Sequence, residues 1–431
     1  MKKLTLICCA IILCVISISA QKFEEHFTNN ALRIDYIFSG DNESKEVALS
    51  GLIQLPQWSG RKHNLSELYL SGNGQISVYD LASNKCIYRD AFSTLFQEWQ
   101  TTDEAKKLKR SFENTYLVPF PKQKVRVEIS FRDRKGNYNK AFSHEVDPTD
   151  ILIKKQGLRN TVPYRYIHKA DSSLYSPINV AIVAEGYTKK DMQLFYKHAR
   201  TAVSEIIAHT PFKKFADRFN FIAIETASTQ SGVSVPRENK WQQTAFSSHF
   251  DTFYSDRYLT TSHVFDLHDA IAGIPYAHII ILAKTDVYGG GGIFNAYTLT
   301  TTGHRGFKPV VVHEFGHSFA GLGDEYFYES DVLDATYTTN IEPWEKNITS
   351  LVNFKDKWEN LLMKGTPIPT HTDENSVKKY PIGVFEGAGY LSKGMYRSSI
   401  DCRMHTNTCD DFCPACQKVI EEIIKFYTEQ K

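Results

Sequence analysis

The sequence lacks an excess of charge of either sign. Its 431 residues include 50 Lys and Arg and 49 Asp and Glu, which gives a formal net charge of +1 at pH 7. Without a strong overall field, the chain has no general electrostatic attraction for nucleic acid or for an anionic membrane surface. We therefore expect a protein without a nucleic-acid partner.

Long hydrophobic runs are also scarce. The one clear example follows the basic start MKK and reads LTLICCAIILCVI, with SISA after it. This order predicts a signal peptide over residues 1–20, with the mature chain beginning at Ala20 or Gln21. A membrane anchor and a lipoprotein are the alternatives, but the run is short for a span and its cysteines follow no small residue. No later segment is apolar enough to span a bilayer, so we expect an exported bacterial protein that is periplasmic, cell-surface or secreted.

Cysteine is sparse beyond the predicted signal peptide. Five of the eight cysteines remain there: Cys86, Cys402, Cys409, Cys413 and Cys416. In an exported chain, disulfides are the first expectation. The last four cysteines therefore predict two disulfides of undetermined pairing, with a structural zinc knuckle as the alternative. Cys86 is isolated and is expected to be a free thiol.

The length of the chain and a change of pattern predict two domains. Over residues 21–150 the hydrophobic residues mostly alternate, as in ALRIDYIF (31–38) and KVRVEISFR (124–132). Such alternation is typical of strands with one buried face, so we expect a β-sandwich accessory domain. A helical stretch is expected to interrupt it at FSTLFQEWQTTDEAKKLKRSF (92–112).

Residues 151–176 are expected to be a linker, and the pattern changes in residues 177–431. Strands are predicted at 178–188, 218–227 and 277–284, and an amphipathic helix at 189–212. This order of strands and helices indicates an α/β domain. The expected fold class is therefore α+β, with an N-terminal β-sandwich and a C-terminal α/β domain.

The motif that carries the chemistry is HEFGHSFAGLGDEY, residues 313–326. His313 and His317 are four residues apart, so on a helix both imidazoles share a face and can reach one cation. Glu314 lies beside that face, where a carboxylate can take a proton from metal-bound water. The pattern predicts one catalytic Zn²⁺, although a pair of ordinary helix histidines is the simpler alternative.

The third ligand decides which subclass of zinc site this would be. Gly321 and Gly323 can both end the helix, and the first carboxylate after them is Asp324. A catalytic zinc site uses three protein ligands and keeps one position open. We therefore expect Asp324 as the third ligand, with Glu325 or a glutamate on a later helix as alternatives.

Two further groups are candidates for contacts with substrate. Gly290 and Gly291 lie in YGGGGIFNAYTL (288–299), where glycines could line an edge strand that holds an extended substrate. A tight turn and a nucleotide loop are the alternatives. Tyr326 and Tyr396 could each donate a hydrogen bond to a developing oxyanion, or both could be ordinary packed aromatics.

Residues 313–326 resemble the signature of the immunoglobulin-A-specific metallopeptidase family, H-E-x-G-H-x-x-x-x-L-x-D-E-Y. VAEGYT (183–188), VFEGAGY (384–390) and Cys-Arg-Met at 402–404 are similar as well, as are FSTLFQEWQTT and VPFPK near the N-terminus. The resemblance implies a metzincin-like zinc peptidase preceded by a β-rich domain, so that the C-terminal part would be a zincin-like α/β metallopeptidase domain. It also implies that Met404 forms a methionine turn beneath the metal, the alternative being a core methionine.

The sequence thus predicts an exported zinc-dependent endopeptidase with Glu314 as general base. Its substrate would be a protein or peptide, and a host glycoprotein such as immunoglobulin A is the candidate that the resemblance suggests. The alternatives are a glycan- or glycoprotein-binding surface protein with a degenerate zinc domain and a zinc hydrolase of cell-wall peptides. The sequence gives no oligomeric state.

Overall fold

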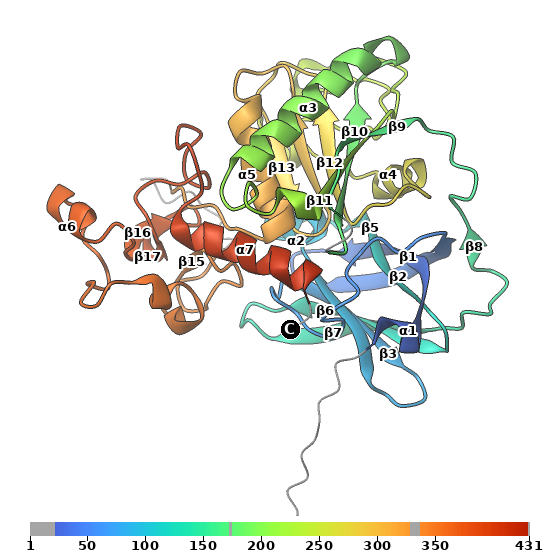
Figure 1. Cartoon of the computed structure of the whole chain (residues 1–431), viewed down its shortest axis with the longest axis horizontal. Coiled ribbons are helices and arrows are strands. Elements are labelled where there is room, and N and C mark those ends of the chain that lie inside the picture. Colours follow the sequence, from blue (N-terminus) through green and yellow to red (C-terminus); the bar gives the residue numbers. More distant parts are fainter. Residues whose placement is uncertain (1–21, 172–174, 328–336, 430–431) are drawn as a thin grey trace, which may run out of the picture.

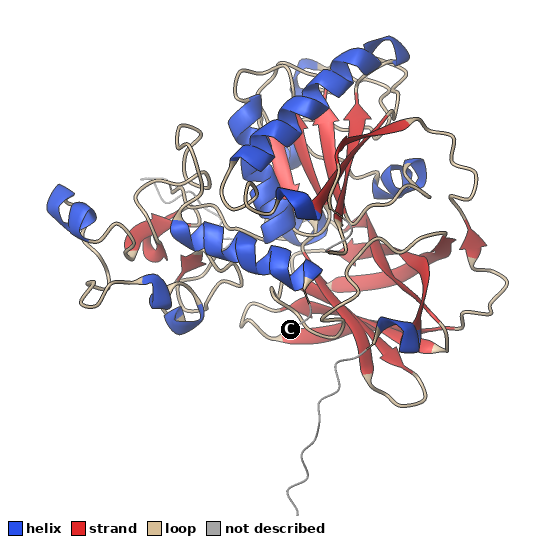
Figure 2. Cartoon of the chain, viewed as in Figure 1, coloured by secondary structure: helices blue, strands red, loops and turns tan. Residues whose placement is uncertain are grey.

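The computed structural model describes residues 22–171, 175–327 and 337–429 (Figure 1). The predicted signal peptide lies outside the described residues. Two regions are visible in Figure 2, one made almost entirely of strands and one in which helices pack on a sheet.

The N-terminal region contains two four-stranded sheets, with strand orders β5-β1-β2-β8 and β4-β3-β6-β7. The first is formed by β1 (Phe27–Gly40), β2 (Lys45–Leu55), β5 (Arg110–Pro121) and β8 (Lys154–Lys155). The second is formed by β3 (Gly74–Asp80), β4 (Cys86–Phe92), β6 (Val125–Arg132) and β7 (Tyr138–Val146). The short helix α1 (Phe23–His26) precedes β1.

Alternating side chains hold these two sheets together. Every second residue of β6, beginning at Val125, is buried, as period-two patterning requires. Phe38 of β1 meets Phe131 of β6 edge to face, with ring centroids 5.1 Å apart, which joins one sheet to the other. The strands predicted over residues 31–38 and 124–132 are confirmed.

The helix predicted over residues 92–112 is mostly wrong. Only α2 (Leu95–Trp99) is helical, and β5 already begins at Arg110. The hydroxyls of Thr101 and Thr102 donate to the carbonyls of Glu98 and Trp99, a local competition that ends helices. The end of the segment then pairs with β1, so ladder formation overrides the local helical pattern.

The second region is built on a six-stranded sheet of order β13-β14-β12-β10-β11-β9. Its strands are β9 (Tyr164–His168), β10 (Ile178–Glu185), β11 (Phe219–Ile224), β12 (His278–Ala283), β13 (Gly290–Ile293) and β14 (Tyr297–Thr301). The four central strands are parallel, and the two edge strands β9 and β13 run antiparallel to their neighbours. The three strands predicted here are confirmed, and so is the long helix, observed as α3 (Met192–Ala208).

Both faces of this sheet are covered. Val180 and Ile182 of β10 pack on the side of α3, α5 (Phe307–Ala320) and α7 (Pro414–Thr428), and Figure 1 shows α3 lying across the sheet. Ala181 and Val183 face the other way, toward α4 (Val264–Ala270) and the core of the N-terminal sheets. One apolar cluster therefore runs from the N-terminal sheets into the six-stranded sheet.

The segment expected to be a linker contributes to both regions. Its β8 pairs with β2, and its β9 forms the edge of the six-stranded sheet against β11. Residues 151–176 are therefore more than a connection, because extended chain running beside an open sheet edge satisfies its backbone by pairing.

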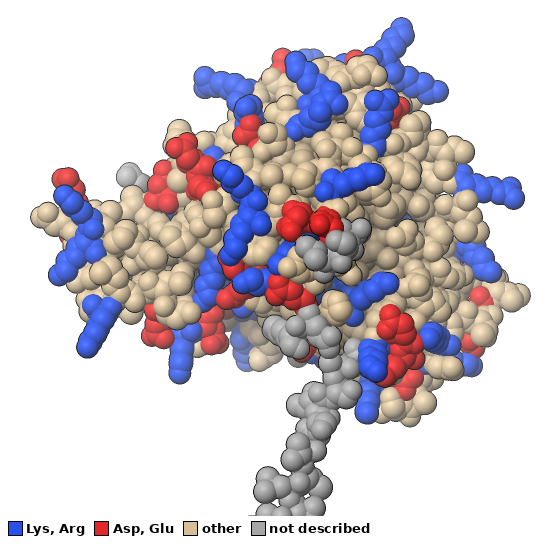
Figure 3. Space-filling model, in the orientation of Figure 1, with Lys and Arg blue, Asp and Glu red and all other residues tan. Residues whose placement is uncertain are grey.

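The C-terminal third adds a small sheet of order β15-β17-β16, formed by β15 (Ile348–Thr349), β16 (Phe385–Ala388) and β17 (Leu391–Arg397). Helix α6 (Glu374–Lys379) lies near it. Across the described residues, six 3-10 helices cover Lys189–Asp191, Ala216–Arg218, Pro236–Glu238, Thr252–Tyr254, Phe354–Asp356 and Glu359–Leu361. On the face in Figure 3, basic side chains are scattered among acidic ones, in keeping with the near-zero net charge. None of the helices in the described ranges is long and apolar enough to cross a membrane.

The cysteines do not form the two expected disulfides. All five cysteines in the described residues are free thiols. The sulfurs of Cys402, Cys413 and Cys416 gather around Glu325, whereas the Cys409 thiol faces the Asp411 carbonyl oxygen at 3.3 Å. Four cysteines in one short stretch therefore do not pair two by two, because one of them points away from the other three.

Candidate metal centre and active-site cleft

Helix α5 carries the His-Glu-x-x-His motif and ends where its glycine predicts. Ala320 is its last residue, and Gly321 adopts a left-handed backbone with φ of 55°. A side chain at that conformation is strained, so glycine suits it. The Leu322 amide then donates back to the Gly316 carbonyl at 3.2 Å, which turns the chain toward the helix. The reversal brings Asp324 next to the two histidines.

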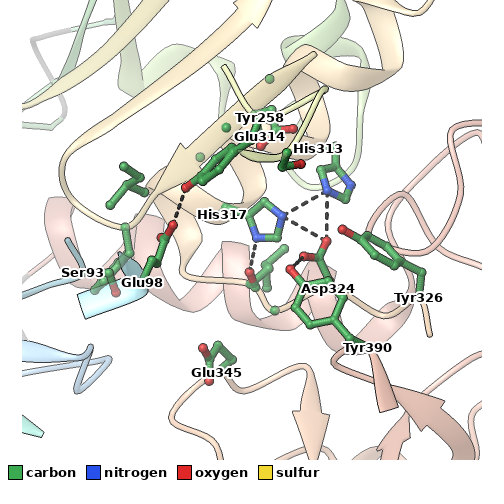
Figure 4. Close-up of a pocket in the computed structure, with 18 of the residues that line it drawn as sticks. Ser93, Glu98, Tyr258, His313, Glu314, His317, Asp324, Tyr326, Glu345 and Tyr390 are labelled. Atoms are coloured by element: carbon green, nitrogen blue, oxygen red, sulfur yellow. Dashed lines mark hydrogen bonds and ion pairs between the residues drawn. The ribbon is translucent and has the colours of Figure 1, made fainter. Parts of the chain in front are cut away.

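Three side chains converge as the motif predicts (Figure 4). The Nε2 atoms of His313 and His317 are 3.0 Å apart, and each lies 3.2 Å from Oδ1 of Asp324. Zinc bound to nitrogen and oxygen at about 2.0–2.2 Å would hold its ligand atoms at roughly this mutual spacing. Among the described residues, these three alone form the histidine-containing group with ligand atoms within 4.8 Å.

The imidazoles are oriented by backbone carbonyls. Nδ1 of His313 lies 3.0 Å from the Arg403 carbonyl oxygen, and Nδ1 of His317 lies 2.5 Å from that of Leu322. Each Nδ1–H can donate to its carbonyl, which leaves the Nε2 lone pair facing the shared centre. Metal-binding histidines are typically oriented in this way.

Asp324 is a buried carboxylate, and one of its two oxygens already accepts a hydrogen bond. Its Oδ2 accepts a hydrogen bond from the Tyr390 hydroxyl, whereas its Oδ1 accepts none among the described residues. Burial alone would raise the pKa of Asp324, but the two imidazoles, when protonated, hold that pKa below its usual range. An ionised oxygen without a donor, aimed at two imidazole nitrogens, fits a cation between them.

Glu325, the alternative third ligand, faces the opposite way. It is fully buried, and its Oε1 lies 3.0 Å from the Cys416 sulfur and 3.1 Å from Nδ2 of Asn347. Successive residues of an extended chain point to opposite sides, so Asp324 and Glu325 cannot both face the histidines.

Glu314 belongs to α5, and its side chain faces the glycine-rich edge strand β13. A Cβ on Gly290 would come within 2.9 Å of Glu314 Oε1, and one on Gly292 within 2.3 Å of the Glu314 carbonyl oxygen. The glycines thus let the strand run directly against the helix. Removal of the carboxylate from water raises the pKa of Glu314, the direction that improves a general base.

A cleft with a volume of about 660 Å³ opens over these groups. Its lining includes the three converging residues, Glu314 and the glycines of β13. Ser93 and Glu98 enter the cleft from the N-terminal region (Figure 4). The accessory region therefore forms one wall of the candidate active site.

The remaining sequence candidates are placed differently. Gly290, Gly291 and Tyr326 line the cleft, and the Tyr326 ring lies 6.5 Å from that of His313. Tyr396 lies on β17, where it pairs with Thr349, and is not among the cleft-lining residues. Met404 is fully buried under α5, where its sulfur would lie 2.9 Å from a Cβ on Gly316.

Three residues that line the cleft were not identified from the sequence: Tyr390, Tyr258 and Glu98. Tyr390 holds Asp324, and Tyr258 donates to the carboxylate of Glu98. Burial raises the pKa of Glu98 to about 7. Tyr390 does fall in the VFEGAGY segment, but nothing in that pattern marks its hydroxyl, and Glu98 lies more than 200 residues before the motif.

Tyr390→Phe should weaken metal binding while the fold is kept. The change removes the hydroxyl that orients Asp324, and loss of such an outer partner typically costs about 10–100-fold in metal affinity. The measurement is the zinc concentration that gives half-maximal activity. Tyr396→Phe is the matched control and should behave as wild type; equal zinc requirements in both variants would contradict the role of Tyr390.

Two models of known protein families match this chain. A model described as IgA Peptidase M64 matches residues 168–381 and 372–424, and a model described as Peptidase M64 N-terminus matches residues 22–143. The chain belongs to the IgA peptidase M64 family. Comparison with curated proteins gives no match.

The M64 family assignment agrees with the convergence of His313, His317 and Asp324. The family is a metallopeptidase family, which indicates protease activity for this chain, and the resemblance found in the sequence is confirmed. The N-terminal M64 match covers the region that supplies Ser93 and Glu98 to the cleft.

Proposed function

We propose that the protein is an exported zinc-dependent endopeptidase. The observation that carries the proposal is the convergence of His313, His317 and Asp324, with their ligand atoms 3.0–3.2 Å apart at the floor of a cleft. The donor set of two imidazole nitrogens and one carboxylate oxygen suits zinc and leaves a position open. The donor-free Oδ1 of Asp324 fits such an ion.

In this proposal zinc would be held by His313, His317 and Asp324. When bound, such an ion supplies Lewis-acid chemistry that activates water and polarises the scissile carbonyl. Glu314 accepts the proton of the attacking water and returns it to the leaving amine. The Arg403 and Leu322 carbonyls keep the two imidazoles in the orientation that binding needs.

The substrate chain is proposed to lie along β13. This strand is the last of the six-stranded sheet, and Gly290 lies against the Glu314 carboxylate. The Gly290 amide already donates to the Arg257 carbonyl at 3.3 Å, so the substrate backbone would pair with the residues after Gly290. An extended peptide can add to a sheet edge through its backbone, which brings a peptide bond to the catalytic groups. Tyr326 lines the cleft with its ring 6.5 Å from that of His313, and it would donate to the developing oxyanion. Met404 would be the apolar floor of the centre.

We also propose domain limits for this architecture. Residues 21–150 would be a β-sandwich accessory domain, and residues 177–431 a zincin-like catalytic domain. The common core and the shared cleft favour a fixed accessory domain that helps to select substrate. Among protein substrates, a host glycoprotein such as immunoglobulin A is the candidate that the family description suggests.

Chelation should test the function directly. The mature chain, incubated with an unfolded protein, should cut it, lose activity when zinc is chelated and regain activity when zinc is restored. Immunoglobulin A and a pool of cell-wall peptides, tested in parallel, separate a glycoprotein substrate from a cell-wall substrate. Failure to cut any protein with zinc bound would overturn the proposal.

A further inference from the structure

A second group of possible metal ligands lies behind the first. Glu325, Cys402, Cys413 and Cys416 are all buried, and their ligand atoms lie within 4.8 Å of one another. They come from three segments: the residue after Asp324, the turn that contains Met404, and the N-terminus of α7.

The spacing of these atoms suits a shared cation. The sulfurs of Cys402 and Cys416 are 3.8 Å apart, and Oε1 of Glu325 lies 3.0 Å from the Cys416 sulfur and 3.5 Å from that of Cys413. Tetrahedral zinc with bonds of about 2.3 Å separates two sulfur ligands by about 3.8 Å. Three sulfurs and one carboxylate oxygen also make up the four ligands of a closed structural site.

The carboxylate of Glu325 is difficult to explain without a cation. It is fully buried, and its Oε2 has no hydrogen-bond partner among the described residues. Arg397 attracts it, but Nη1 of Arg397 donates to the carbonyls of Glu386 and Gly387. A disulfide between two of the cysteines would still leave this Oε2 without a partner, and a buried polar atom without a partner is costly.

Backbone amides also face two of the sulfurs. The amides of Met404 and Cys413 lie 3.4 and 3.2 Å from the Cys402 sulfur, and the Cys416 amide lies 3.5 Å from that of Cys413. Cys413 caps α7, a helix of 15 residues, and Cys416 lies in its first turn. The positive end of a helix stabilises anionic sulfur.

We propose that Glu325, Cys402, Cys413 and Cys416 bind a second, structural cation, with zinc as the ion that best suits three thiolates and a carboxylate. The thiols release their protons to solvent as the metal–sulfur bonds form. The site differs from a four-cysteine knuckle, because Glu325 replaces Cys409. The inference stands independently of the proposed function.

The second site would brace the first. Its ligand Glu325 follows Asp324 directly, and the Glu325 amide donates to the Met404 carbonyl at 2.9 Å. Its ligand Cys402 begins the turn whose Arg403 carbonyl orients His313. A cation here would therefore fix two of the segments that arrange the histidine centre.

The test uses the full mature chain loaded with zinc and freed of excess metal. Elemental analysis should find about two zinc ions per chain, one of which is lost in His317→Ala and the other in Cys416→Ser. Cys409→Ser is the matched control and should keep both. Replacement of zinc by cobalt(II) should give intense thiolate-to-metal absorption in the wild type and in His317→Ala, but not in Cys416→Ser.

The wild type and His317→Ala keep the test decisive even if Cys416→Ser fails to fold. Cobalt-loaded wild type without thiolate absorption would overturn the proposal. So would a Cys402–Cys416 disulfide found by mass spectrometry of the zinc-loaded chain. Thiolate absorption in a chain that cuts no protein would support this site and would count against the proposed function alone.

Discussion

Glu314→Gln should keep its catalytic metal and lose proteolysis. The change preserves the size of the side chain and the contact with Gly290 but removes the group that accepts the proton. A positioned general base contributes about 10²–10⁴-fold to the rate, so the variant should fall by at least that factor. None of the three proposed ligand side chains changes, and zinc content should stay at the wild-type value.

The measurement combines turnover of an unfolded protein with zinc analysis of the same sample. Glu205→Gln is the matched control. Glu205 lies on α3 and pairs with Lys308 at the start of α5, with 2.7 Å between Oε1 and Nζ, so the control loses a carboxylate that does not line the cleft. Glu205→Gln should keep wild-type activity. Wild-type activity in Glu314→Gln would show that Glu314 is not the general base.

Asp324→Asn should raise the zinc requirement sharply. The amide cannot provide the anionic oxygen that faces His313 and His317 at 3.2 Å. Loss of a direct ligand should exceed the about 10–100-fold cost of losing an outer partner. Half-maximal activity should therefore need more than about 100-fold more free zinc, and activity at limiting zinc should disappear.

The assay titrates activity with buffered zinc and monitors folding by circular dichroism. Asp286→Asn, an exposed residue in the loop after β12, is the control and should titrate like the wild type. If Asp324→Asn responded to zinc as the wild type does, Asp324 would not be the third ligand.

The sequence predicts most of the local chemistry of the site. A spacing of four residues puts His313 and His317 on one helix face, and Gly321 ends that helix because glycine adopts the left-handed backbone without strain. The buried strand β10 and helix α3 follow from hydrophobic periodicity. These features depend on residues that are neighbours in the chain.

What the sequence could not predict depends on residues far apart in the chain. Tyr390 reaches Asp324 across 66 positions, and Glu98 enters the cleft from the other region. The end of the segment expected to be helical at 92–112 instead pairs with β1. This pairing is a tertiary interaction, which the local sequence pattern does not encode. The grouping of three cysteines with Glu325 likewise needs the turn at Met404 to bring distant segments together.

The central claim is that His313, His317 and Asp324 hold the catalytic metal. A crystal structure with anomalous diffraction measured on both sides of the zinc absorption edge tests it most directly. We predict a zinc peak about 2.0–2.2 Å from Nε2 of His313, Nε2 of His317 and Oδ1 of Asp324. A zinc-loaded, proteolytically active crystal without a peak at that position would contradict it.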